Sequence, residues 1–361
     1  MNTQALHTYI PNLKQEEPLL ISGPCSAETK TQVLETAQLI REKTNTHIYR
    51  SGIWKPRTRP GQFEGIGEAG LEWLKEVKQK TGLLVTTEVA KAEHVELCLK
   101  AGIDILWIGA RTVANPFSIQ EIADSLKGTN IPVFIKNPIN PDIGLWIGAI
   151  ERINKAGISK IAAIHRGFYP YEETKFRNIP KWEIAIELKR QFHKLPIICD
   201  PSHISGDTNF IKEVSQKAYD LNFDGLMIET HIHPQEALSD ASQQVTPQQL
   251  KTLLTDLIIR SAPIKNQEVL LQYREQIDSI DHQLLELLSK RMDVINGIGE
   301  YKLKNNITIF QLRRWENIIK TRINLGDDLG LDPHFIQSIL ELMHKDSIRI
   351  QNNIMNIKKK L

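Results

Sequence analysis

The chain has 361 residues, and its 45 Lys and Arg against 43 Asp and Glu leave a formal net charge of +2, which excludes the strongly basic surface of typical nucleic-acid-binding proteins. No run of about eighteen apolar residues predicts a membrane span, and residues 1–18 lack the pattern of a secretory signal. Three scattered cysteines, Cys25, Cys98 and Cys199, do not form a disulfide framework. We therefore expect a cytoplasmic protein without nucleic-acid or membrane partners.

A β-rich apolar run, a polar loop and an amphipathic helix recur eight times between Pro18 and about Arg260. The runs are PLLISGPC, HIYRSGI, GLLVTTEV, DILWIGAR, PVFIKNP, KIAAIHRGF, LPIICDPSH and GLMIETHIH. Their near-continuous hydrophobicity indicates parallel strands that are buried on both faces. The pattern predicts an α/β fold, a (β/α)8 TIM barrel over residues 1–262, because a doubly wound sheet usually has fewer strands and a glycine-rich first turn that is absent here.

Chemically active side chains follow nearly all of the predicted strands, and in a barrel these strand ends converge on one pocket. The cationic ones are Arg50, Lys55, Arg57, Arg111, Lys136 and Arg166. Each alone would be an ordinary solvated loop residue. Together in one cavity they would repel one another unless an anion lay between them, and their groups suit phosphate and carboxylate. The pattern favours a site for phosphorylated substrates, on a loop that Pro56 and Pro60 stiffen.

A second set of residues near the strand ends offers sulfur, nitrogen and oxygen ligands: Cys25, His203, Glu229 and Asp240. Such a mixed set suits a borderline divalent ion such as manganese, iron, cobalt or zinc. The spacing leaves alternatives open, because the four residues form no compact Cys/His cluster. In the alternative without a metal, Cys25 is a small buried turn residue, and His203 is a hydrogen-bonded loop residue. Cys98 and Cys199 are expected to be packing residues.

The motifs GPCSAE, KPRTRP, TEV, IGART, IKNP, HRGF, DPSH, and IET followed by SDASQQ occur in this order over residues 18–260. They resemble the 3-deoxy-D-arabino-heptulosonate 7-phosphate (DAHP) synthase family, in particular its short microbial type I subfamily. The family condenses phosphoenolpyruvate with erythrose 4-phosphate. The related octulosonate 8-phosphate synthases carry Ala-Asn-Arg after the loop lysine, whereas KPRT stands here, which favours the four-carbon acceptor.

The resemblance implies a role for each strand-end residue. It implies a divalent metal ion on Cys25, His203, Glu229 and Asp240. It implies phosphoenolpyruvate contacts from Arg50, Lys55, Arg111, Lys136 and Arg166, and aldose contacts from Arg57 and Thr58, with Pro56 and Asp240 near the other end of the aldose. Glu88 would hold a water near the reacting carbon. Lys55 would exchange a proton with the new alkoxide, with a metal-bound water as the rival. A non-catalytic phosphate-binding barrel is the alternative, which loss of product in Cys25→Ala would contradict.

Strand signals end at SAPIKNQEV, and only helical periodicity follows. We expect a linker over 263–267 and a separate all-α three-helix domain over 268–361. Its helices should run from about 267 to 304, from 308 to 324 and from 332 to 357. Asp332 supplies an N-cap for the last helix, and Pro333 occupies its first position.

Polar residues occupy the apolar stripes of these three helices. Arg291 and Lys302 lie on the stripe of the first helix. Arg314 points similarly from the second helix, and Ser347 and Gln351 from the third. Buried cations without acidic partners require an external anion, although snorkelling or coiled-coil register would also account for cations there.

Distances along the first helix predict how the chains assemble. Arg291 and Lys302 are about 16 Å apart along a helix, which suits one small ligand. Arg274 is about 42 Å from Lys302 and can share its site only from a second chain. We therefore predict that the helical domain dimerises and forms two shared sites.

The motifs YREQIDSIDHQLLELLSKR, GEYK, LRRW and DSIRIQN are similar to those of the all-helical chorismate mutases. The resemblance implies that Arg291, Arg314 and the partner's Arg274 bind the two carboxylates of chorismate. It implies that Lys302 and Gln351 hydrogen-bond the ether oxygen during rearrangement to prephenate. The usual D-x-x-R-E pattern reads Gln311-Leu-Arg-Arg314-Trp315 here, which puts recognition of the substrate hydroxyl in question.

The two resemblances together predict a bifunctional transferase and isomerase of aromatic amino-acid biosynthesis, in the shikimate pathway. Feedback inhibition by prephenate through the mutase domain is expected, because residues 1–17 leave no room for a separate regulatory domain. The alternative is a synthase whose helical domain acts mainly as a ligand-sensing and dimerisation module. The changes at Gln311 and Trp315 keep this alternative open.

Overall fold

The computed structural model describes residues 1–55, 61–171, 173–260 and 267–357. Contacts within the chain divide it into two compact units, residues 1–262 and 263–361. Pro56, Arg57 and Thr58, which the sequence assigns to the aldose, lie outside the described residues.

Eight parallel strands form a closed barrel in chain order, in which β1 pairs with both β2 and β8. The strands are β1 (Leu19–Gly23), β2 (Ile48–Arg50), β3 (Leu84–Val89), β4 (Ile105–Ile108), β5 (Val133–Lys136), β6 (Ile161–His165), β7 (Ile197–Cys199) and β8 (Gly225–Glu229). Each lies within one of the eight predicted runs, and the TIM barrel is confirmed. Nearly all strand residues are buried, which explains why their sequences do not alternate between apolar and polar.

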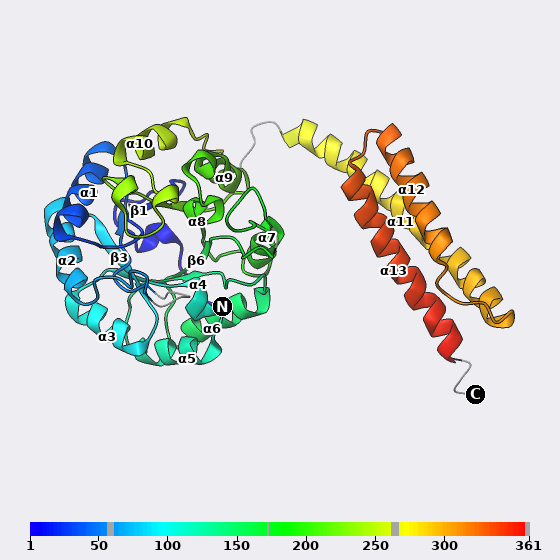
Figure 1. The fold of residues 1–361 in the computed structure, drawn as a ribbon, viewed down its shortest axis with the longest axis horizontal. Coiled ribbons are helices and arrows are strands. Elements are labelled where there is room, and N and C mark those ends of the chain that lie inside the picture. Colours follow the sequence, from blue (N-terminus) through cyan, green and yellow to red (C-terminus); the bar gives the residue numbers. More distant parts are fainter. Residues whose placement is uncertain (56–60, 172, 261–266, 358–361) are drawn as a thin grey trace. The chain divides into compact units, whose positions relative to one another are not determined.

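Helices surround the ring of strands (Figure 1). They are α1 (Lys30–Lys43), α2 (Ala69–Thr81), α3 (Ala92–Ala101), α4 (Ala110–Val113), α5 (Pro116–Ser125), α6 (Ile143–Lys155), α7 (Trp182–Gln191), α8 (Pro201–Ser205), α9 (Thr208–Asp220) and α10 (Pro247–Asp256). Short 3-10 turns are η1 (Leu6–Thr8), η2 (Pro234–Glu236) and η3 (Ala241–Gln243). Cys98 and Cys199 are buried free cysteines in the layer between helices and strands, as expected of packing residues.

A second apolar cluster fills the inside of the barrel. Trp107, Phe134 and other inward-facing strand residues pack there together with Leu6 and Ile10 of the N-terminal segment. That segment is held at the start of β6, where the Gln4 backbone N–H donates to the Ser159 carbonyl oxygen (2.9 Å). It therefore lies at the amino ends of the strands, which leaves the carboxyl ends for the site.

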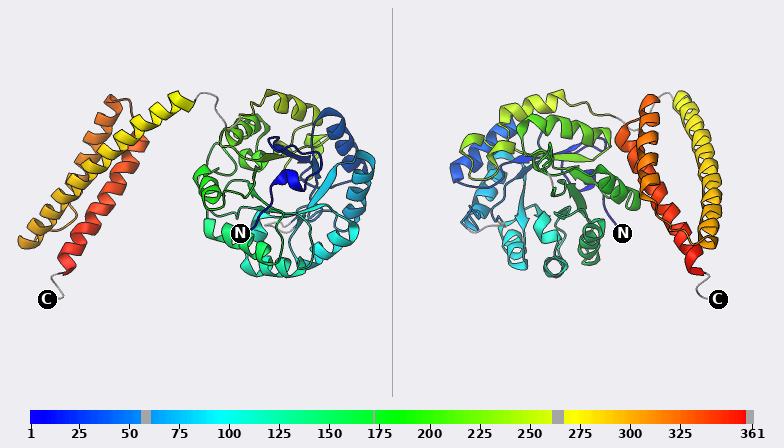
Figure 2. Two further views of the ribbon diagram at one scale, coloured as in Figure 1. Left: turned by 180° about the vertical axis from the view of Figure 1, so that it is seen from behind. Right: turned by 45° about the vertical axis from the view of Figure 1, so that its right-hand side comes forward.

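The C-terminal unit consists of α11 (Gln267–Lys304), α12 (Leu312–Asp328) and α13 (Pro333–Ile357). Helix α13 packs against both α11 and α12 (Figure 2). The expected cap of α13 is confirmed, because Asp332 Oδ1 accepts a hydrogen bond from the Phe335 backbone N–H (2.8 Å). The three-helix fold is as predicted.

The predicted bounds of the second helix, 308–324, are wrong by four residues at each end. Its beginning is displaced because the backbone is still extended at Gln311, which takes the N-cap position without a side-chain cap hydrogen bond. Its end is displaced because the chain leaves the helix only at Gly330, whose φ of +76° favours glycine.

The first half of the apolar stripe of α11, over residues 271–290, has no partner within the described part of a single chain. Every side chain from 271 to 290 is exposed, including Ile277 (56 %) and Leu284 (52 %). Exposed apolar surface of this extent is typical of a face that another molecule covers. Within the described ranges, no helix combines the length and the apolar character that a bilayer crossing needs.

Candidate active sites

A cavity of about 380 Å³ opens at the carboxyl ends of the barrel strands. Its charged and polar lining comes from the carboxyl ends of seven different strands and from the loops that follow them, as expected for a TIM barrel. The lining includes Lys55, Gln62, Glu88, Arg111, Lys136, Arg166, Arg177, Asn178, His203 and Asp240. Seven of these residues were predicted from the sequence as site residues, and the structure brings them together.

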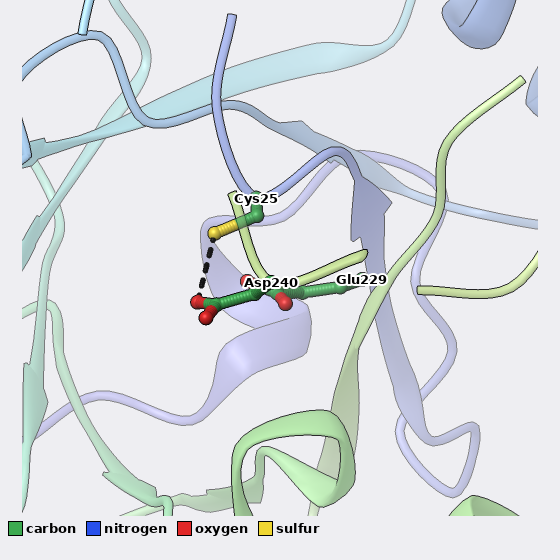
Figure 3. Close-up of side chains that lie close together, drawn as sticks. All are labelled: Cys25, Glu229 and Asp240. Carbon is green, nitrogen blue, oxygen red and sulfur yellow. Dashed lines mark hydrogen bonds between the residues drawn. The ribbon is translucent and has the colours of Figure 1, made fainter. Parts of the chain in front are cut away.

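Beside this cavity, the ligand atoms of Cys25, Glu229 and Asp240 lie within 4.8 Å of one another. Figure 3 shows the three side chains pointing toward a common centre, with Cys25 Sγ 3.3 Å from Asp240 Oδ2. Cys25 follows β1 and Glu229 ends β8, two strands that pair directly. Gly23 allows a close approach of β1 to β2, since a Cβ there would lie 2.1 Å from the Arg50 carbonyl oxygen.

His203 lies next to this group, in the first turn after β7. Its Nε2 lies 3.7 Å from Glu229 Oε1, and its Nδ1 lies 2.8 Å from Asp200 Oδ2. Burial lowers the pKa of His203 despite the nearby Asp200 charge, so the imidazole is neutral. A carboxylate on Nδ1 orients a histidine so that Nε2 is available to a metal. Sequence reasoning missed Asp200, although its place before Pro201 marks the N-cap of α8.

Arg177 is a second residue that sequence reasoning missed. Its Nη1 donates to Asp240 Oδ1 (2.9 Å) and to Gln243 Oε1 (2.6 Å), and Gln243 in turn donates to Glu229 Oε2 (2.6 Å). Burial opposes ionisation of Asp240, but the charge of Arg177 holds the pKa of Asp240 well below its usual range. Arg177 lies inside the long loop between β6 and α7, so no strand end marks it.

The environment of Cys25 tests whether the group fits a metal ion. Burial, followed by the charge of Glu229, raises the pKa of the Cys25 thiol to about 12, although Lys55 Nζ lies 3.0 Å from Sγ. Glu229 Oε1 is buried and accepts no hydrogen bond from the described residues. A thiol that needs added positive charge to ionise, beside two carboxylates and a neutral imidazole, fits a divalent cation of the borderline class.

Two of the predicted cations have carboxylate partners that the sequence pattern did not reveal. Arg50 is 1 % exposed and lies 3.2 Å from Glu229 Oε1, with its guanidinium 4.8 Å from the Trp107 ring centre. Lys136 Nζ lies 2.8 Å from Asp200 Oδ2. The repulsion among the six cations is therefore smaller than the sequence suggested.

Arg166 remains in a positive environment. It donates to the neutral Asn178 Oδ1 (2.8 Å). Burial, with the charges of Arg177 and Arg111, lowers the pKa of Arg166 to about 10, although the Asp200 charge opposes this shift. Because its surroundings disfavour its positive charge, the charged form of Arg166 is strongly stabilised when an anion enters the cavity.

Glu88 reaches the cavity next to Gly109. Trp107 Nε1 donates to Glu88 Oε2 (3.1 Å). A Cβ at position 109 would lie 2.0 Å from Glu88 Oε1, so the glycine makes room for this carboxylate. The Glu88 side chain is thus fixed on the wall of the cavity. The family resemblance implies that this residue holds a water.

The helical unit contains a second cluster of predicted residues. Arg291 Nη1 donates to Ser347 Oγ (2.9 Å), and Gln351 Nε2 donates to the Ser347 carbonyl oxygen (3.2 Å). Lys302 Nζ donates to the Ile309 carbonyl oxygen (2.6 Å), and partial burial lowers the pKa of Lys302. Neither cation forms an ion pair with a carboxylate of the described residues, so an external anion would complete the cluster.

Arg274 and Arg314 are exposed, and α11 is one continuous helix from Gln267 to Lys304. The rise of a helix therefore keeps Arg274 about 42 Å from Lys302 in the same chain. Trp315 lies next to Arg314 and stacks on His344, with ring centres 4.0 Å apart. Sequence reasoning missed His344, although it precedes Ser347 by one helical turn.

Comparisons with known proteins give a family match for each of the two units. The DAHP synthetase I family matches residues 8–260, and chorismate mutase type II matches residues 273–352. A phospho-2-dehydro-3-deoxyheptonate aldolase of Thermotoga maritima is 32 % identical over 238 residues, which cover 66 % of this chain and 68 % of that protein. A 2-dehydro-3-deoxyphosphooctonate aldolase of Wolinella succinogenes is 28 % identical over 264 residues, 67 % of this chain and 99 % of that protein.

The crystal structure of the Thermotoga maritima aldolase, a DAHP synthase, superposes with a TM-score of 0.63 at 29 % identity, over 71 % of this chain and 72 % of that one. The DAHP synthetase I match spans the barrel with its strand-end cavity, and the mutase match spans the cluster on α11 and α13. The chain therefore belongs to the DAHP synthetase I family and carries a C-terminal chorismate mutase type II domain, so a transferase and an isomerase are joined in one polypeptide.

Proposed function

We propose that the barrel condenses phosphoenolpyruvate with erythrose 4-phosphate to DAHP and phosphate, and that the helical domain converts chorismate to prephenate. Both reactions belong to aromatic amino-acid biosynthesis, which we place in the cytoplasm. The observation that carries the proposal is the convergence of five cations, four of them predicted, with a sulfur, nitrogen and oxygen ligand group at one barrel mouth.

In the barrel, Cys25, His203, Glu229 and Asp240 would hold a manganese-, iron-, cobalt- or zinc-class ion, which when bound polarises the aldehyde. Arg50, Lys55, Arg111, Lys136 and Arg166 bind the carboxylate and phosphate of phosphoenolpyruvate, so that its enol carbon faces the aldehyde. Pro56, Arg57 and Thr58 are proposed to contact erythrose 4-phosphate.

The proton steps fall to two residues on the cavity wall. Lys55 gives a proton to the new alkoxide after the carbon–carbon bond forms. Glu88 holds the water that adds to the carbon bearing the phosphate ester, and cleavage of the carbon–oxygen bond then releases phosphate. Lys55 Nζ already lies at the ligand group, 3.0 Å from Cys25 Sγ.

The choice of acceptor separates two reactions of this family. The heptonate aldolase relative is 32 % identical and the octonate aldolase relative 28 %, and KPRT at positions 55–58 also favours the shorter sugar. We expect kcat/KM to favour erythrose 4-phosphate over arabinose 5-phosphate by about a hundredfold or more. Phosphoenolpyruvate consumption with each aldose measures this, before and after chelation. A preference for the five-carbon sugar would contradict the proposal.

In the helical domain, we propose a homodimer in which the partner chain covers the exposed stripe of α11. Arg291, Arg314 and the partner's Arg274 bind the carboxylates of chorismate. Lys302 and Gln351 stabilise the negative charge that develops on the ether oxygen as its carbon–oxygen bond breaks. The exposed Ile277 and Leu284 support the dimer, because a single chain leaves them in water.

We propose that prephenate inhibits the synthase through the mutase domain. Saturating prephenate should lower the synthase rate at least about fivefold, since coupling between sites is typically 1–3 kcal/mol. Initial rates with and without prephenate measure the effect, and Arg291→Ala should remove it. Undiminished synthase activity at saturating prephenate would overturn this regulation.

A helical domain that acts mainly as a ligand-sensing and dimerisation module is the second candidate. The ring stack between Trp315 and His344 favours it, because Trp315 holds the place of the usual acid. Such a module would bind prephenate and inhibit the synthase without turning over chorismate.

A further inference from the structure

One half-buried histidine of the helical domain, His344, has no function in the proposed mutase reaction. The His344 ring stacks on Trp315, with ring centres 4.0 Å apart and an interplanar angle of 16°, and Phe310 contacts it at 5.9 Å. Two aromatic neighbours fix the plane of the imidazole. Its two nitrogens therefore point in set directions.

His344 lies on the face of α13 that forms the anion cluster. It precedes Ser347 by three residues and Gln351 by seven, so the three side chains share one face. Its pKa is lowered by partial burial and by the charges of Arg291 and Lys302. The imidazole is therefore neutral and offers hydrogen bonds rather than charge.

The cluster has buried hydrogen-bonding atoms that the described residues leave unused. His344 Nε2 and Gln351 Oε1 are buried and have no hydrogen-bond partner there. Buried polar atoms are usually satisfied, and a site that is built to hydrogen-bond a substrate discriminates strongly against an analogue lacking that group. The ligand of this cluster should therefore carry a neutral polar group as well as its negative charges.

We propose that His344 Nε2 hydrogen-bonds a neutral hydroxyl of the dicarboxylate substrate, and that Trp315 is the positioning residue that sets its ring plane. The inference rests on the proposed mutase function and assigns to this chain its own hydroxyl-binding residue. Arg291 and Lys302 already provide the positive charge, so a neutral imidazole adds selectivity without adding repulsion among cations.

The test compares two bicyclic ether dicarboxylates that mimic the rearranging substrate, one with the ring hydroxyl and one without. Their Kd values are measured by calorimetry on the full-length protein. We expect the native protein to favour the hydroxylated compound about tenfold or more. His344→Leu should reduce this preference to about twofold or less. His344→Gln, whose amide nitrogen can reach the place of Nε2, should restore most of it.

Two further variants test whether the effect depends on the position of the His344 ring or on a general change in the fold. His334→Leu changes an exposed histidine of the same helix and should leave the preference unchanged. Trp315→Leu should weaken the preference while the affinity for the compound without the hydroxyl stays near native. That affinity also shows that each variant has folded.

The outcomes distinguish the hydroxyl contact of His344 from the mutase function itself. If His344→Leu keeps the native preference, the hydroxyl contact is wrong while the mutase function stands. If the native protein binds neither dicarboxylate, the mutase function fails, and the His344 contact fails with it.

Discussion

Replacing Cys25 by alanine is expected to lower the synthase kcat by about a thousandfold or more, with chorismate turnover unchanged, because metal catalysis supplies several kcal/mol. Cys25 Sγ is one of three ligand atoms within 4.8 Å of one another. Its loss leaves Glu229 and Asp240 without the sulfur that completes the group. Phosphoenolpyruvate consumption measures the rate, and metal content after dialysis measures the ligand group independently.

The matched control is Cys98→Ala, which removes a thiol of the same burial from α3. It should cost some stability through the space it leaves, while both metal content and kcat stay near native. A Cys25→Ala protein that keeps full synthase activity would exclude the metal role. Loss of activity with native metal content would show that Cys25 takes part in the reaction but is not a metal ligand.

Replacing Arg291 by alanine is expected to lower the mutase kcat/KM by about a thousandfold, with the synthase rate unchanged. Arg291 is half-buried, bonds Ser347 and has no carboxylate partner among the described residues, so it is available for the carboxylate of the substrate. Chorismate consumption measures the effect. Lys290→Ala, which removes an adjacent exposed cation of α11, is the control and should be near native.

A mixture of two inactive variants then tests the shared site. Arg274→Ala and Arg291→Ala homodimers should each lack mutase activity. After subunit exchange, half of the dimers are mixed, and one of the two sites in each is intact, so about a quarter of native activity should return. No recovery, with exchange verified by labelled chains, would show that Arg274 serves no site of a second chain.

Local signals predicted most of the fold. The eight strands are marked by apolar runs, because strands buried on both faces need little polar sequence. Asp332 and Pro333 mark the start of α13, because an N-cap acts within one turn. The bounds of α12 were wrong, because glycine at position 326 is tolerated inside the helix and the stop comes only at Gly330.

The strand-end rule also predicted which residues meet in the barrel. Glu88, Arg111 and Lys136 lie at or just after the carboxyl ends of three different strands, and closure of the sheet brings them to one cavity. The rule has no information on residues inside loops, and Arg177 was missed for that reason. It also did not predict that Arg50 and Lys136 have buried carboxylate partners.

The order of apolar runs, caps and strand-end side chains thus determines by itself that this chain forms a barrel with an anion-binding mouth, followed by three helices with cations on their packing faces. Only the tertiary structure decided that Lys136 pairs with Asp200, that Arg177 holds Asp240 and that Trp315 covers His344. Each of these pairs joins segments that are far apart in the sequence. Their contacts depend on how those segments pack, and short-range sequence patterns carry no record of that.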